Sequence, residues 1–155
     1  MMDKTELTKL DEILSRHKNS AEELIPILQE TQDQFGFLSA DIIEKAVKYL
    51  HIPASKAYGV ATFYSFLATK PAGRNVIRVC KSLPCCYKNS AIVIKSIENE
   101  LRIKPGEITP DGKFSLELTN CIGGCDSPPA MLINRDMHNN LTPEKISLIL
   151  KSYSS

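Results

Sequence analysis

The chain has 155 residues, of which 43% are hydrophobic and 24% are charged, and its formal net charge is +1. This length suits one large domain or two small ones, with enough apolar residues for a buried core. The near-neutral charge argues against a nucleic-acid-binding or membrane-surface protein, and no apolar run approaches the length of a membrane-spanning helix.

The first half of the chain predicts helices. Apolar residues repeat with helical spacing within residues 7–14, which indicates a first helix. Ser20 to Glu23 has the pattern of a capping box and is expected to open a second helix, which Gly36 would end. Ser39 suits the N-cap of a third helix, and residues 58–67 are expected to form a fourth.

The fourth predicted helix is rich in aromatic residues. They are Tyr58, Phe63, Tyr64 and Phe66. Such a group can be a docking face, because aromatic side chains are enriched at interfaces. A place in the core is the commoner role, and it is the one expected here.

The strongest break in the sequence is Pro71 to Gly73, and it predicts a domain boundary. We expect a helical domain over residues 1–73 that docks a partner, and a second domain over 74–155. The second half predicts strands at 75–79, 114–118 and 130–133, helices at 90–101 and from Pro143, a turn at Pro110–Gly112 and a hairpin turn at Arg135–Asp136. The order β-α-β-β-α is that of a small thioredoxin-like α/β sandwich, so the fold class is expected to be α+β.

Four of the five cysteines form two pairs. Cys80 and Cys85 have the spacing C-x4-C, and Cys121 and Cys125 have the spacing C-x3-C. Each pair follows the end of a predicted strand, so the two loops are expected to meet at one edge of the sheet. Thiolates in two such loops can hold a metal ion or an iron–sulfur cluster, or can form disulfides.

The surroundings of these pairs favour an iron–sulfur cluster without excluding the alternatives. The polar start of the chain, Met1 to Lys4, does not resemble a signal peptide, so a cytoplasmic location without membrane insertion is expected, where lasting disulfides are rare. Zinc sites usually use C-x2-C, whereas the wider spacings here suit the two irons of a [2Fe–2S] cluster. A zinc-stabilised interaction module and a thiol–disulfide redox protein remain open. Cys86 is expected to be a partly buried bystander, and Arg78 and Lys81 either offset an anionic cluster or are solvated surface charges.

These motifs resemble the thioredoxin-like [2Fe–2S] ferredoxin family, which includes the E-type subunits of NADH dehydrogenase. The family is shared by respiratory complex I, NAD-dependent formate dehydrogenases and electron-bifurcating hydrogenases. The similarity covers nearly the whole chain and rests on Ile25–Glu30, Val60–Phe66, Ile108–Phe114, Pro128–Pro129 and the two cysteine pairs. The sequence departs from the family pattern at Gly124 and Pro128, where the family commonly has alanine. Those changes are expected to affect loop rigidity or the hydrogen bonds to sulfur.

The resemblance implies one [2Fe–2S] cluster, with Cys80 and Cys85 on one iron and Cys121 and Cys125 on the other. It implies an electron-transfer subunit of a multisubunit, flavin-dependent NAD(P)H oxidoreductase, either an electron-bifurcating hydrogenase or related complex or an NADH:quinone oxidoreductase. Its partners would be a flavoprotein subunit with FMN, an NAD(H) site and a [4Fe–4S] cluster, and further iron–sulfur, hydrogenase or formate dehydrogenase subunits. The chain has no glycine-rich dinucleotide loop and no catalytic constellation, so no catalytic residue and no NAD site are expected in it.

Overall fold

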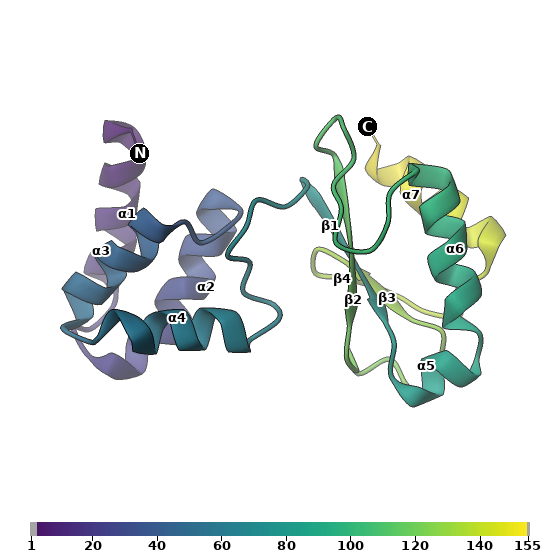
Figure 1. Cartoon of the computed structure of the whole chain (residues 1–155), viewed down its shortest axis with the longest axis horizontal. Helices are drawn as coiled ribbons and strands as arrows, with labels where there is room; N and C mark the ends of the chain where they lie inside the picture. Colours follow the sequence, from purple (N-terminus) through teal and green to yellow (C-terminus); the bar gives the residue numbers. More distant parts are fainter. Residues whose placement is uncertain (1–2, 155) are drawn as a thin grey trace. The chain divides into compact units, whose positions relative to one another are not determined.

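The computed structural model describes residues 3–154; Met1, Met2 and Ser155 lie outside this range, so what is expected of the first two residues is not tested. The chain divides into two compact units, a helical unit that ends at Pro71 and a sheet unit that begins at Ala72 (Figure 1). Within the described residues, no helix is long and apolar enough to cross a membrane.

The helical unit contains α1 (Lys4–Arg16), a short 3-10 helix η1 (Ala21–Glu23), α2 (Leu24–Phe35), α3 (Ala40–Leu50) and α4 (Ala54–Phe63). The capping box lies at Asp3 and Glu6, where each side chain accepts the other's backbone N–H at the start of α1. The capping box expected at Ser20 is wrong, because the Ser20 side chain makes no cap hydrogen bond and the segment after it is the 3-10 helix. Ser39 does cap α3, and Gly36 ends α2 with a positive φ of 83°.

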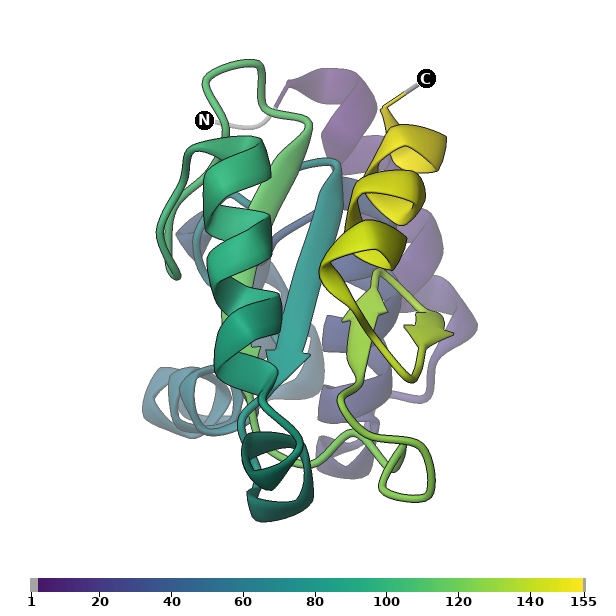
Figure 2. The same ribbon diagram turned by 90° about the vertical axis from the view of Figure 1, so that its right-hand side faces the viewer.

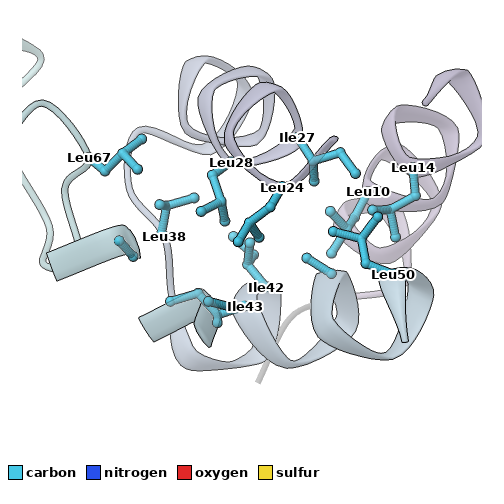
Figure 3. Packing of buried hydrophobic residues seen from close by; sticks show 13 residues of the cluster. Leu10, Leu14, Leu24, Ile27, Leu28, Leu38, Ile42, Ile43, Leu50 and Leu67 are labelled. Atoms are coloured by element: carbon cyan, nitrogen blue, oxygen red, sulfur yellow. The ribbon is translucent and has the colours of Figure 1, made fainter. Parts of the chain in front are cut away.

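Leucine, isoleucine and alanine side chains from α1 to α4 meet in one core (Figure 3). The fully buried members include Leu10, Ile27, Leu28, Leu38 and Ile43. The aromatic residues around the end of α4 do not join this core, since Phe63 is 80% exposed and Tyr58, Tyr64 and Phe66 are also exposed. The expectation that they are core residues is therefore wrong, and α4 both begins and ends earlier than predicted.

The sheet unit contains β1 (Asn75–Cys80), α5 (Leu83–Tyr87), α6 (Ser90–Leu101), β2 (Phe114–Thr119), β3 (Met131–Ile133), β4 (Asp136–His138) and α7 (Pro143–Tyr153). The strand order is β2-β1-β3-β4. β1 and β2 are parallel, whereas β3 is antiparallel to both β1 and β4. The α5–α6 connection thus carries the chain from the end of β1 back to the start of β2, as a parallel pair requires.

The helices α6 and α7 lie on the same face of the sheet (Figure 2). Their apolar side chains pack on Ile77, Leu116 and Ile133 to form the second core. Alternate residues of the strands point to the other face. Arg78 of β1 and Glu117 of β2 are register partners and form an ion pair of 2.9 Å between Nε and Oε2, although Arg78 is only 8% exposed.

The predicted elements of the sheet unit are largely confirmed, with three differences. α6 has the predicted bounds, and Thr142 caps α7 by accepting the backbone N–H of Lys145. The short helix α5 and the strand β4 were not predicted. The hairpin turn comprises Asn134 and Arg135 rather than Arg135 and Asp136, because Asp136 already pairs with Ile133 in the sheet.

Gly73 lies so close to β2 that no side chain fits there. A Cβ added to Gly73 would be 2.4 Å from the carbonyl carbon of Phe114 and 2.7 Å from the backbone nitrogen of Ser115. Both are backbone atoms of a paired strand and cannot move aside cheaply. Next to it, the backbone N–H of Arg74 donates to the Gly112 carbonyl at 2.9 Å, which holds the start of the sheet unit against the turn before β2.

Candidate cluster site

The sheet topology brings the two cysteine pairs to one edge. Cys80 is the last residue of β1 and is in register with Thr119, the last residue of β2. Cys121 follows two residues later. Because β1 and β2 are parallel, both strands end at the same edge, where α5 and the loop after β2 lie at the bottom of Figure 2.

The first pair is buried. Cys80 and Cys85 are each 1% exposed, and they pack together with Ala130 and Ile122. The backbone N–H of Cys80 donates to the Ala130 carbonyl at 3.2 Å, which ties the end of β1 to the residue before β3. Burial raises the pKa of the Cys85 thiol; a hydrogen bond donated by the Ala130 backbone opposes this increase, and Cys80 adds to it. A neutral thiol is therefore favoured at this position in the chain without a bound group.

The second pair is exposed. The Sγ atoms of Cys121 and Cys125 are 3.2 Å apart, and the backbone N–H of Gly123 points to Cys121 Sγ at 3.5 Å. The hydrogen bond from Cys125 lowers the pKa of Cys121, helped by Gly123. The same bond raises the pKa of Cys125 to about 11. Of the two thiols, Cys121 is therefore the first to lose its proton as pH rises.

The two pairs are close enough to influence each other. Repulsion from Cys121 contributes to the raised pKa of Cys85, and repulsion from Cys85 and Cys80 contributes to that of Cys125. Even so, no three histidine, cysteine, aspartate or glutamate side chains among residues 3–154 are arranged to hold one metal ion. The cysteines thus lie as two pairs that are near enough to repel each other when charged.

The second pair matches the reach of a single metal ion. Two thiolates on one tetrahedral ion, at a metal–sulfur distance of about 2.3 Å, lie about 3.8 Å apart. The observed 3.2 Å therefore requires only a small opening of the loop. The same distance is well above the about 2.05 Å of a disulfide bond, so the structure holds both sulfurs as thiols.

The other residues singled out in the sequence lie apart from the sulfurs or differ from expectation. Cys86 is exposed on α5 rather than partly buried. Arg78 is not a solvated charge, since it is buried and paired with Glu117, whereas Lys81 is exposed. Ala130 was not predicted as part of the site. Ala130 contributes a backbone carbonyl to Cys80 and a methyl group to the packing around the first pair. Neither contribution gives a recognisable pattern in the sequence.

Comparison with known proteins identifies close relatives. The family described as thioredoxin-like [2Fe–2S] ferredoxin matches residues 10–154. The E-type subunit of NADH-quinone oxidoreductase from Escherichia coli K12 is 43% identical over 129 residues, covering 83% of this chain and 78% of that protein. Its counterpart from Rickettsia bellii is 38% identical, covering 96% of this chain and 90% of that protein. The NADP-reducing hydrogenase subunit HndA of Solidesulfovibrio fructosivorans is 32% identical, covering 84% of this chain and 76% of that protein.

A solved structure has the same fold. The chain superimposes on the NAD+-reducing [NiFe]-hydrogenase in its air-oxidized state with a TM-score of 0.76 and 22% sequence identity. The match covers 88% of this chain and 24% of the matched hydrogenase chain. The likeness shows the thioredoxin-like α+β fold.

Proposed function

This chain belongs to the thioredoxin-like [2Fe–2S] ferredoxin family, and from that premise we propose that it is a one-electron carrier within a larger NAD(P)H-linked oxidoreductase. The cofactor of the family is a [2Fe–2S] cluster. The relatives named above are subunits of NADH-quinone oxidoreductase and of a hydrogenase. The single observation that carries the proposal is the convergence of two cysteine pairs at the ends of two parallel strands.

The donor set fits a two-iron cluster. Cys80 and Cys85 would hold one iron, and Cys121 and Cys125 would hold the other. A [2Fe–2S] cluster requires four thiolates, two for each iron, and the two neighbouring pairs supply this set more readily than they would a single zinc ion, which requires all four around one point. When bound, such a cluster accepts and releases a single electron.

The chain's own residues give the two sides of the site different surroundings. Cys80 and Cys85 are enclosed with Ala130 and Ile122, which excludes water from the first pair. Cys121 and Cys125 are exposed, so the second pair is open to solvent or to a partner. Electron exchange with a partner's redox centre is therefore assigned to the side of the second pair.

We further propose that the helical unit docks a flavoprotein subunit that carries FMN, an NAD(H) site and a [4Fe–4S] cluster. The support is the aromatic patch formed by Tyr58, Phe63, Tyr64 and Phe66, all of them exposed. Aromatic side chains are enriched in the buried centres of interfaces. The parent complex would be an electron-bifurcating hydrogenase, a formate dehydrogenase or an NADH:quinone oxidoreductase.

Anaerobic loading of the chain with iron and sulfide tests the cluster. The expected product is brown, contains two irons and two acid-labile sulfides, and gives an EPR signal only after reduction. Serine at Cys80, Cys85, Cys121 or Cys125 should lower the iron content and change the spectrum. Cys86→Ser is the matched control, because Cys86 is a neighbouring thiol outside both pairs, and it should load normally.

Two results would contradict this assignment. A colourless protein that binds one zinc ion through the same four cysteines would indicate a structural interaction module. A metal-free protein in which Cys121 and Cys125 cycle reversibly between thiols and a disulfide would indicate a thiol–disulfide redox protein.

Co-purification tests the docking surface. Phe63→Ser should weaken retention of the flavoprotein subunit while leaving the absorbance of the cluster unchanged. Leu148→Ser is the control, because Leu148 is also an exposed apolar residue, 69% exposed, but lies on α7. Equal loss of the partner in both variants would remove the support for the aromatic patch.

A further inference from the structure

Gly124 lies between the two cysteines of the second pair. The side chain of Asn139 fills the space that a side chain at Gly124 would occupy. A Cβ added at Gly124 would be 2.7 Å from Asn139 Oδ1, 3.0 Å from Ala130 Cβ and 3.4 Å from Met137 Sδ. Gly124 is buried, and its φ is not positive, so its backbone conformation does not require glycine. What requires glycine is the carboxamide of Asn139, which occupies the space where a methyl group would lie.

The position of the Asn139 side chain is set by packing rather than by hydrogen bonds to its oxygen. Asn139 Oδ1 is buried and has no hydrogen-bond partner among the described residues. A buried acceptor in this state normally has a specific structural reason. Here the close approach to the Gly124 backbone is such a reason.

Asn139 cannot easily move away from Gly124, because the two residues that follow Asn139 are hydrogen-bonded to the loop that contains Gly124. The backbone N–H of Asn140 donates to the Ser127 carbonyl at 2.9 Å, and that of Leu141 donates to the Pro129 carbonyl at 3.2 Å. Within the loop, the N–H of Ser127 reaches back to the Gly124 carbonyl at 3.3 Å. The segment after β4 therefore clamps the loop that carries Cys125.

We propose that Asn139 is a positioning residue for the second cysteine pair. Gly124 makes this possible, because its missing side chain leaves the space that the Asn139 carboxamide occupies. Asn139 fixes the backbone at Gly124, and thereby the distance and orientation of Cys125 relative to Cys121. The consequence for the bound cluster rests on the proposed function, in which these two cysteines hold one iron. The consequence for the thiols of the cluster-free chain does not.

A double-mutant cycle of Gly124→Ala, Asn139→Ala and the double variant tests the pairing in the cluster-free chain. Gly124→Ala should lower the thermal midpoint by about 4 °C or more, and should lower it much less when Asn139 is already alanine. Gly59→Ala is the control for the added methyl group, because a Cβ at Gly59 meets no atom within 4 Å. It should not lower the midpoint.

The alkylation rate of Cys125, relative to that of the exposed Cys86 in the same molecule, reports on positioning. Iodoacetamide followed by mass spectrometry gives this ratio without a cluster. The ratio should change several-fold in Gly124→Ala and in Asn139→Ala, and the double variant should resemble Asn139→Ala. In the loaded chain, the EPR spectrum of the reduced cluster should follow the same pattern.

Two results would overturn the proposal. If Gly124→Ala lowers the midpoint equally in both backgrounds, Asn139 is not what excludes a side chain there. If the midpoints are coupled but the alkylation ratio is the same in all variants, Asn139 has a structural role only. A wild-type chain that takes up no cluster would contradict the proposed function, while the alkylation ratios would still decide the role of Asn139.

Discussion

The hydroxyl of Tyr153 donates a hydrogen bond to Asp136 Oδ2 at 2.6 Å. His138 Nε2 lies 3.3 Å from the same hydroxyl, and its ring meets the Tyr153 ring edge to face at a centroid distance of 6.0 Å. Tyr153 is the last residue of α7, and Asp136 and His138 begin and end β4. This group therefore fastens the last helix to the edge strand of the sheet.

Tyr153→Phe should lower the free energy of unfolding by about 0.5–1 kcal/mol, since it removes the solvent-accessible hydrogen bonds of the hydroxyl to Asp136 and His138. The carboxylate of Asp136 raises the pKa of Tyr153 to about 12. Because the folded chain holds the proton more tightly, this contribution is fully present below the ordinary tyrosine pKa of about 10 and is lost as pH rises towards about 12. Urea unfolding and a tyrosinate absorbance titration check both statements. Tyr87→Phe is the control and should leave stability unchanged, because Tyr87 is 85% exposed on α5.

Stability should also depend on pH near neutrality through His17. Its two ring nitrogens lie 2.9 Å from Glu23 and 2.7 Å from Glu30, and Arg16 pairs with Glu30 as well. These hydrogen bonds raise the pKa of His17 above its ordinary value. The contribution is therefore complete below pH of about 6.5 and is lost as pH rises through the folded-state pKa.

His17→Gln should cost roughly 1 kcal/mol at pH 6 and less at pH 8. Urea midpoints measured across this range should fall with rising pH in the wild-type chain and flatten in the variant. His51→Asn is the matched control, because His51 has a φ of 53° and asparagine tolerates that conformation. A wild-type slope that survives in His17→Gln would show that another group is responsible.

Gly73→Ala should destabilise the sheet unit by about 1–3 kcal/mol, because its methyl group would overlap the backbone of Phe114 and Ser115. Thermal and urea unfolding give the size of the loss. Gly59→Ala, in the interior of α4, should instead be neutral or gain up to about 1 kcal/mol from improved helix propensity. Similar behaviour of the two variants would mean that β2 can move away from Gly73.

Glu117→Gln should destabilise the chain by about 1–2 kcal/mol, since it leaves the guanidinium of the buried Arg78 beside a neutral amide. The loss is expected at the lower end for a buried ion pair, because the Glu117 side chain is 33% exposed. Glu44→Gln breaks a pair with Lys48 in which both side chains are well exposed, and its stability should be unchanged. Equal stability of Glu117→Gln and wild type would indicate that Arg78 is satisfied by other groups.

Local sequence signals predicted a helix correctly where a capping residue and a periodic run of apolar residues indicate the same start. Thr142 with Pro143 marked the start of α7, and the bounds of α6 were correct. The signals failed where a pattern has two structural solutions. Ser20 to Glu23 has the spacing of a capping box, but the chain there forms a 3-10 turn before α2 begins at Leu24. The aromatic residues from Tyr58 onward are apolar enough for a core and yet are exposed. Helical periodicity alone does not show whether an apolar face is buried.

The sequence predicted the four cysteines of the candidate site. It did not predict the residues and the short helix that position them. The two pairs follow strand ends that the sequence indicates, and spacing alone left zinc and disulfide chemistry open. The short helix α5 begins three residues after Cys80 and contains Cys85, and it is too short for a periodic signal. The contact between Gly124 and Asn139 joins residues 15 positions apart through a glycine, which carries no side chain to indicate it.

The pairing of β1 with β2 has a consequence for how the chain acquires its cofactor. Cys80 and Cys121 lie at the same edge of the sheet because Cys80 is opposite Thr119 in the parallel ladder. A slip of two residues would keep every side chain on its face of the sheet but move Cys121 by about 6.6 Å along the strand. With the cysteines assigned as proposed, such a misaligned sheet could not bridge both pairs with one cluster. Cluster uptake would therefore select the chains whose strands have paired in the native register.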